Sequence, residues 1–220
     1  TYNYPFHLRN MLKLKTVSLL KHRSDLSILP EGKLLINTIN AHSYNTALKD
    51  AGFAEALLKG GALIPDGASI VLAFRWLRKE SIERTCLLYT SEAKTVYPNI
   101  RIETYSPPYK PEFTEEENQM MIDAINAVKP DLLWIGMTAP KQEKWAYTHL
   151  DALEVNGHIG TIGAVFDFFA GTVERAPVRW QEHGLEWLYR LTKEPRRMWR
   201  RYIIGNALFL WNITKEKFSI

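Results

Sequence analysis

The stretch KPDLLWIGMTAPKQEKWAYTHL, residues 129–150, decides the fold. Asp131 to Ile135 is a short, mostly apolar run, which is typical of a strand buried inside a parallel sheet. After a short loop, a helix is predicted from Pro140 to Leu150, because proline is pre-organised for the first position of a helix. A strand followed directly by a helix is the repeating unit of an α/β fold.

Similar units lie on both sides of this stretch. Further strands are predicted at four places: 33–39, 61–64, 100–104 and 158–162. Further helices are predicted at three: 41–59, 70–77 and 115–128. This alternation predicts a Rossmann-like α/β fold, with a mostly parallel sheet flanked by helices.

Beyond Gly171 the composition changes, and tryptophan and basic residues become frequent. Between Arg190 and Tyr202 there are six basic residues and one acid, although the whole chain has a net charge of only +4. We therefore predict a Rossmann-like catalytic domain over 1–183 and a helical, membrane-associating appendage over 184–220. Such a concentrated positive charge suits phosphate, whether in a lipid head group, a pyrophosphate or a nucleic acid.

Composition also excludes several classes of protein. Cys86 is the single cysteine, so an internal disulfide framework is excluded and a reducing compartment is expected. The longest apolar stretch, 203–213, is about half of the roughly 20 residues that a bilayer span needs. We therefore expect a chain that lies on a membrane or in water rather than one that crosses a membrane.

In open α/β sheets, ligands bind where the strands end. The polar segments just past the predicted strands are expected to form this rim: 38–40, 65–67, 136–142 and 163–167. Any catalytic chemistry is therefore predicted to lie along this one edge of the sheet.

Several motifs in these segments and in the C-terminal region resemble the WecG/TagA/CpsF family of bacterial glycosyltransferases. In order along the chain they are INTINAH (36–42), PDGASIV (65–71), APKQEKW (139–145), GAVFDFFAGTVERAP (163–177) and GLEWLYRLTKEPRRMWRRY (184–202). The resemblance implies an inverting enzyme that needs no metal or other cofactor. It would move a sugar such as N-acetylmannosamine from UDP to an undecaprenyl-diphosphate-linked sugar, at the cytoplasmic face of the membrane, in cell-surface polysaccharide synthesis.

The resemblance also assigns catalytic residues. Asp66 matches the proposed base, which takes the proton of the attacking hydroxyl. Local sequence alone favours a different role for Asp66, the capping of the following helix, and a carboxylate bonded to helix N–H groups is a weaker base. Thr38 and Asn40 match active-site positions, although helix capping also explains Asn40. Arg84 matches an arginine that handles the diphosphate, with a surface arginine as the alternative.

The donor is expected to bind near two further segments. Lys141 and Gln142 lie at a helix start, where free N–H groups attract phosphate, although an ordinary helix that begins with proline looks the same. Gly67 allows close approach of a substrate. Asp167 lies between two phenylalanines, where it either binds the nucleotide or pairs with Arg175.

Arg190, Arg197 and Arg200 match arginines through which the appendage of the family reaches the active site. The chain has no Asp-x-Asp pair of the kind that holds a metal in many glycosyltransferases. The charge on the departing diphosphate is therefore expected to be balanced by arginine, lysine and helix N-termini. The alternative role for these arginines is a basic surface facing solvent or a membrane.

One departure from the family lies between Arg84 and Pro98, where an α/β unit is shortened to about a dozen residues. Either this member is truncated there, or residues between the flanks are missing from the sequence. A Rossmann-like fold and a basic tail also suggest two other functions. A Rossmann dehydrogenase would need a Gly-x-Gly-x-x-Gly after the first strand, and none is present there. A non-enzymatic module that binds nucleic acid or membrane through the basic tail is the remaining alternative. We expect no nucleic-acid partner, and self-association stays open.

Overall fold

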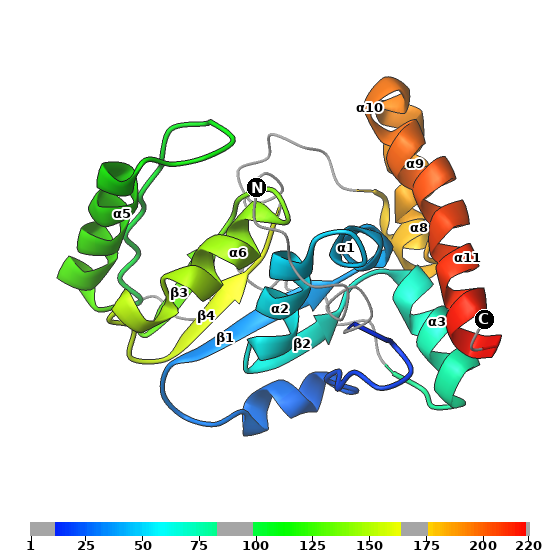
Figure 1. The fold of residues 1–220 in the computed structure, drawn as a ribbon, viewed down its shortest axis with the longest axis horizontal. Coiled ribbons are helices and arrows are strands. Elements are labelled where there is room, and N and C mark those ends of the chain that lie inside the picture. Colours follow the sequence, from blue (N-terminus) through cyan, green and yellow to red (C-terminus); the bar gives the residue numbers. More distant parts are fainter. Residues whose placement is uncertain (1–11, 83–98, 164–175, 219–220) are drawn as a thin grey trace.

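The computed structural model describes residues 12–82, 99–163 and 176–218 (Figure 1). Within these residues four parallel strands form one sheet in the order β2-β1-β4-β3. The strands are β1 (Leu34–Ile39), β2 (Ala62–Pro65), β3 (Leu132–Ile135) and β4 (His158–Thr161). The predicted α/β fold with a parallel sheet is confirmed.

The strand β1 lies inside the sheet and is buried on both faces. Leu35 and Ile39 are buried on one face, where α2 and α6 pack. Ile36 points to the other face and packs with Ile64 of β2. Alternate burial on two faces explains why this strand is an almost continuous apolar run, as the sequence predicted.

Six helices of the described residues flank the sheet or extend from it (Figure 1). They are α1 (Ala41–Ala47), α2 (Ala51–Lys59), α3 (Ala68–Arg78), α5 (Glu115–Val128), α6 (Lys141–Thr148) and the C-terminal α11 (Gly205–Phe218). The prediction of a single helix over 41–59 is wrong, because the first helix ends at Ala47 and a second helix begins at Ala51. The Oδ1 atom of Asp50 accepts the N–H of Phe53 at 3.0 Å and starts α2 as a separate helix.

The strand predicted over 100–104 is also wrong. The structure has no strand there, and Ile100 and Ile102 are 44% and 47% exposed. The neighbouring β3 is an edge strand of the sheet within the described residues. An alternating apolar pattern stabilises a strand only where a partner strand takes its hydrogen bonds, and this segment has none in the described part of the chain.

The C-terminal region is helical, as predicted. The shorter helices are α8 (Val178–Glu182), α9 (Glu186–Lys193) and α10 (Pro195–Trp199), followed by a π-helical segment, Arg200–Ile204, that leads into α11. Phe209 and Ile213 of α11 are 1% and 2% exposed and share one hydrophobic core with Ile39 of the sheet. The last helix is therefore part of the main body of the fold.

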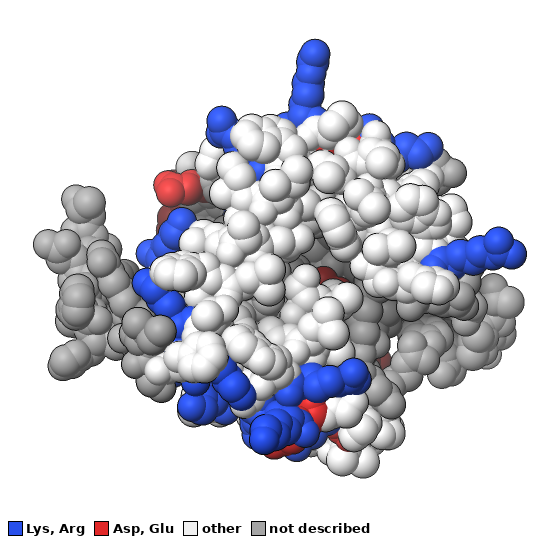
Figure 2. Space-filling view, turned by 90° about the vertical axis from the view of Figure 1, so that its right-hand side faces the viewer, with Lys and Arg blue, Asp and Glu red and all other residues white. Residues whose placement is uncertain are grey.

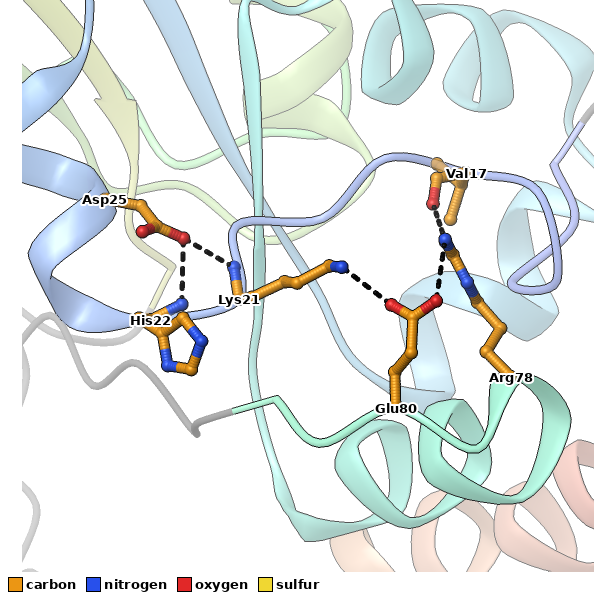
Figure 3. Close-up of polar contacts among 6 residues, drawn as sticks. All are labelled: Val17, Lys21, His22, Asp25, Arg78 and Glu80. Carbon is orange, nitrogen blue, oxygen red and sulfur yellow. Dashed lines mark hydrogen bonds and ion pairs between the residues drawn. The ribbon is translucent and has the colours of Figure 1, made fainter.

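The segment before β1 holds the far end of α3 in place (Figure 3). Lys21 forms an ion pair with Glu80 at 2.7 Å, and Arg78 donates to the carbonyl of Val17 at 3.2 Å. Asp25 accepts the backbone N–H groups of Lys21 and its neighbour, both at 2.9 Å. These contacts fix the C-terminal end of α3, whose N-terminal end carries the predicted catalytic segment.

Candidate active site

Asn40 and Asp66 lie side by side where β1 and β2 end. The backbone N–H of Asp66 donates to the carbonyl of Ile39 at 2.8 Å, which continues the pairing of the two strands by one bond. The amide Nδ2 of Asn40 donates to Oδ2 of Asp66 at 3.4 Å. The parallel sheet thus brings together two predicted catalytic residues that are 26 positions apart.

Asp66 does not cap the helix that follows it. The N-cap of α3 is Gly67, and no side chain caps this end of the helix. Among the described residues the Asp66 carboxylate accepts a hydrogen bond from Asn40 alone. A partly exposed carboxylate without helix N–H bonds keeps lone pairs for a substrate proton, as a general base requires.

Gly67 has a backbone conformation that leaves the space beside Asp66 open. Its φ of 84° is one that residues with a Cβ rarely adopt. A Cβ built on Gly67 would meet no atom of the described residues within 4 Å. Glycine therefore sets the turn from β2 into α3 and leaves room for a ligand to approach the backbone.

Asn40 caps α1, which is one of the two roles that the sequence suggested, and its active-site role stays a prediction. Its Oδ1 accepts the N–H of Ser43 at 3.0 Å, so it caps α1, and its other amide atom contacts Asp66. Capping thus orients the amide toward the carboxylate. Thr38 precedes Asn40 by two positions, pairs in register with Ile64 and is partly buried. Its catalytic role stays a prediction.

A buried polar pair beneath this rim was missed by the sequence analysis. Asn37 and Thr161 are both 0% exposed, and Oγ1 of Thr161 donates to Oδ1 of Asn37 at 3.0 Å. Nδ2 of Asn37 donates to the carbonyl of Ala56 at 2.9 Å. These bonds connect β1, β4 and α2 just below the predicted catalytic residues. The signal in the sequence was a polar residue inside an apolar strand.

Gln142 connects the ends of β3 and β4. Its side chain is 2% exposed, and its Oε1 accepts the N–H groups of Met137 and Gly163, both at 3.0 Å. Its Nε2 donates to Oε1 of Glu143 at 2.8 Å. The amide is thus used to hold two rim segments together, and a direct contact of Gln142 with the donor stays a prediction.

Lys141 contacts the segment that precedes α5. Its Nζ donates to the carbonyl of Lys110 at 2.5 Å and lies 3.4 Å from the ring centre of Phe113. Burial lowers the pKa of Lys141, and the charge of Lys110 lowers it further. These contacts anchor the neighbouring segment to α6. The role of Lys141 in binding phosphate stays a prediction.

Two predicted site residues, Arg84 and Asp167, lie outside the described residues, as does Arg175. The three C-terminal arginines are described. Arg190 lies 3.9 Å from a carboxylate oxygen of Glu186. Arg197 forms an ion pair with Glu194 at 2.6 Å, and Arg200 stacks on Trp199 with 5.4 Å between guanidinium and ring centre.

The C-terminal helices lie beside the helix ends that carry the site. Gly184, in the turn before α9, is so near Ala68 that an added Cβ would lie 3.0 Å from the Cβ of Ala68. Ala68 is the second residue after Asp66. On α1, Nδ2 of Asn45 donates to the carbonyl of Gly205 at 2.7 Å. The start of the appendage and its last helix therefore border the starts of α3 and α1.

Arg201 lies near enough to His42 for its charge to act on the imidazole, a proximity that the sequence analysis did not predict. His42 lies one turn before Asn45 on α1, and Arg201 lies one turn before Gly205, so the Asn45–Gly205 contact brings both to one place. The side chain of His42 reaches solvent. The surrounding protein nevertheless removes enough water to lower its pKa, and the charge of Arg201 lowers that pKa further.

Replacing Arg201 with glutamine is therefore expected to raise the pKa of His42, because a nearby positive charge that disfavours the imidazolium is removed. An NMR titration of the His42 ring protons measures this shift. Arg196→Gln, which removes an exposed charge from α10, is the matched control and should leave the titration unchanged. An unchanged His42 pKa in Arg201→Gln would show that the two side chains do not face each other.

The side of the molecule formed by α3 and the C-terminal helices is rich in exposed apolar side chains. Figure 2 shows this side as a largely uncharged surface, hollowed near its centre, with lysine and arginine toward its margins. The exposed apolar residues of these elements are Leu72, Trp76, Leu185, Trp187, Trp199, Ile203, Ile204, Leu210, Trp211 and Phe218. We call this set the apolar face.

The described part of the chain contains neither a membrane-spanning helix nor a cluster of metal-binding side chains. No helix there is both long and apolar enough to cross a membrane. No three His, Cys, Asp or Glu side chains there come close enough together to hold a metal ion.

Comparison with known proteins identifies the family. The model of the Glycosyl transferase WecG/TagA/CpsF family matches residues 89–220, more than half of the chain. A relative from Bacillus subtilis (strain 168) is 27% identical over 83% of this chain and 80% of its own length. One from Staphylococcus aureus (strain MW2) is 26% identical over 85% and 82%. Both are named N-acetylglucosaminyldiphosphoundecaprenol N-acetyl-beta-D-mannosaminyltransferase. The motifs, the parallel α/β sheet and the match to the family model agree, and the chain therefore belongs to the WecG/TagA/CpsF family of glycosyltransferases.

Proposed function

We propose that the chain transfers N-acetylmannosamine from a UDP donor to an N-acetylglucosamine unit carried on undecaprenyl diphosphate. The names of the two relatives support both the transferred sugar and the acceptor. The observation that carries the proposal is the Asp66 carboxylate, which lies at the sheet rim beside Asn40 and makes no capping bond.

In the proposed reaction, Asp66 takes the proton of an acceptor hydroxyl as the oxygen attacks the anomeric carbon of the donor sugar. The bond from that carbon to the UDP oxygen breaks on the opposite side, so the configuration inverts. Asn40 holds the carboxylate in position through its amide. Thr38 is proposed to complete this group from the same strand end.

The departing diphosphate gains negative charge and needs positive charge or N–H donors nearby. We propose that Arg84, Arg190, Arg197 and Arg200 supply it, together with Arg201, whose charge acts on His42 of α1. The proximity of the turn at Gly184 to Ala68 supports a path from the appendage to the site. Because the C-terminal basic segment supplies this charge, the proposed reaction uses no metal.

The donor is proposed to bind along the rim between α3 and α6. Gly67 offers open backbone there, and Gln142 keeps the ends of β3 and β4 together. Lys141 and Asp167 are proposed to contact the donor from the same segments, as the family motifs imply.

The apolar face is proposed to rest on the cytoplasmic membrane surface. Exposed tryptophan and aliphatic side chains beside a basic segment suit the boundary between lipid tails and head groups. Each lysine or arginine near anionic lipid contributes about 1 kcal/mol to such binding. This orientation would bring the lipid-linked acceptor to the site from the side of the C-terminal helices. We therefore propose that residues 1–183 form the catalytic part and that residues 184–220 attach the protein to the membrane and complete the active site.

A transfer assay with purified protein tests the proposal. UDP-N-acetylmannosamine and UDP-N-acetylglucosamine are offered separately, with a short-chain polyprenyl-diphosphate N-acetylglucosamine acceptor and with EDTA present. The expected result is product from the mannosamine donor alone, with inverted anomeric configuration by NMR. Retained configuration would rule out a single displacement assisted by Asp66, and loss of product on adding EDTA would rule out the metal-free reaction.

A further inference from the structure

Glu143 is a buried acid in the rim, and one of its two carboxyl oxygens lacks a partner in the described part of the chain. It is the third residue of α6, directly after Gln142, and it is 1% exposed. Its Oε1 accepts the Nε2 donor of Gln142 at 2.8 Å. Its Oε2 is buried and has no hydrogen-bond partner among the described residues. Burying an ionised carboxylate in this way costs free energy, because one of its oxygens loses its hydrogen bonds to water and gains no others.

Charged groups on the elements packed against α6 make no ion pair with Glu143. Those of the described residues on α2, on α6 and on the elements after it are Asp50, Glu55, Lys59, Lys141, Lys144, His149, Asp151 and His158. Those of α5 and of the segment before it, which contact Trp145 and Lys141, are Lys110, Glu112, Glu115, Glu116, Glu117 and Asp123. Lys144 pairs with Asp50 at 3.1 Å, and Lys59 pairs with Glu55 at 2.7 Å. His158 contacts a backbone carbonyl at the opposite end of β4, and Asp151 is exposed.

The burial of Glu143 favours its neutral form. Burial raises the pKa of Glu143, and the hydrogen bonds from Gln142 and from its own backbone lower that pKa only part of the way. A neutral acid satisfies the same Gln142 donor without carrying a charge into the interior.

The partner of Glu143 makes this acid relevant to the site. Gln142 uses its Oε1 for the N–H groups of Met137 and Gly163, so its Nε2 must find an acceptor on the other side. Glu143 is that acceptor. The acid therefore stabilises the orientation of the Gln142 amide in which it holds the ends of β3 and β4.

We propose that Glu143 is a positioning residue that orients Gln142 at the donor site and does so best as a neutral acid, because its second oxygen is buried without a partner among the described residues. This rests on the proposed donor site at the same rim. Ionisation of Glu143 would keep the bond from Gln142 but would add a charge that repels UDP. Affinity for UDP should therefore fall as the pH rises through the pKa of Glu143.

Two measurements that need no transfer activity test this proposal. The first is an NMR titration of the carboxyl carbons in protein labelled with ¹³C-glutamate, in which the Glu143 signal is the one missing from Glu143→Gln. The second is the dissociation constant of UDP, measured by calorimetry between pH 6 and pH 9. Glu31→Gln, which changes an exposed glutamate before β1, is the matched control.

The Glu143 signal is expected to titrate at higher pH than the other glutamates. UDP affinity of the native protein and of Glu31→Gln should fall by up to about tenfold for each pH unit above that pKa. Glu143→Gln, which keeps a neutral acceptor, should bind UDP with nearly constant affinity. Glu143→Ala should bind UDP more weakly at every pH. If the alanine variant fails to fold, the pH dependence of UDP binding by Glu143→Gln tests the proposal by itself.

Titration of Glu143 together with the exposed glutamates would overturn the proposal. So would a parallel loss of UDP affinity with pH in Glu143→Gln and the native protein, since the titrating group would then lie elsewhere. Absence of UDP binding by the native protein at every pH would instead overturn the donor site itself, and this proposal with it.

Discussion

Asp66→Asn is expected to lower the rate of sugar transfer by about 10³-fold and to leave the affinity for UDP unchanged. Asparagine has the same shape and can still accept the hydrogen bond from Asn40, but it cannot take a proton. Because Asp66 makes no capping bond to α3, the fold should not suffer. Initial rates with the lipid-linked acceptor, UDP calorimetry and thermal unfolding measure the three quantities.

Asp50→Asn is the matched control, since Asp50 does cap a helix and also pairs with Lys144. Asparagine is about as good an N-cap as aspartate, so the control should lose little stability and keep most of its activity. A transfer rate that falls less than tenfold in Asp66→Asn would remove Asp66 as the base. An equal loss in both variants would point to a structural effect.

Phe209→Ala is expected to lower the free energy of unfolding by about 3–5 kcal/mol. Phe209 is 1% exposed, and its ring packs edge-on against Tyr44 of α1 with ring centres 5.5 Å apart. Removing it leaves a cavity between α11 and α1, in the same core as Ile39. Denaturant unfolding followed by circular dichroism measures the change.

The next residue along α11 provides the control. Leu210 is 64% exposed and belongs to the apolar face, so Leu210→Ala should change the unfolding free energy by about 0.5 kcal/mol or less. It should instead reduce binding to vesicles that contain anionic lipid. Equal stability of the two variants would mean that α11 is not packed into the body as described.

The fold class was predictable because the strands at 33–39, 61–64, 131–135 and 158–162 are apolar runs with turn residues at their ends. The break at Asp50 was not, because the apolar spacing continues through it and one capping bond decides where α2 begins. The segment 100–104 has a strand-like pattern without a partner strand. The sequence indicates which secondary structure a segment can form, whereas strand pairing depends on which other strands lie beside that segment in the fold.

The site was predictable to a similar degree. The juxtaposition of Asn40 and Asp66 follows from the parallel sheet, and the structure decides the choice between capping and free carboxylate for Asp66. The burial of the Gln142 side chain and its bonds to the backbone were not predictable, because its partners Met137 and Gly163 come from two different loops. The burial of Glu143 was equally hidden, since a glutamate in the first turn of a helix is ordinarily exposed.

The strand order has a consequence for how the chain folds during synthesis. The inner strands β1 and β4 pair Leu34 with His158, so the middle of the sheet cannot form until most of the chain has left the ribosome. The core around Ile39 is completed later still, by Ile213. Contacts so distant in sequence form slowly and leave apolar strands uncovered meanwhile. Chaperone dependence of the nascent chain should therefore persist until α11 has emerged.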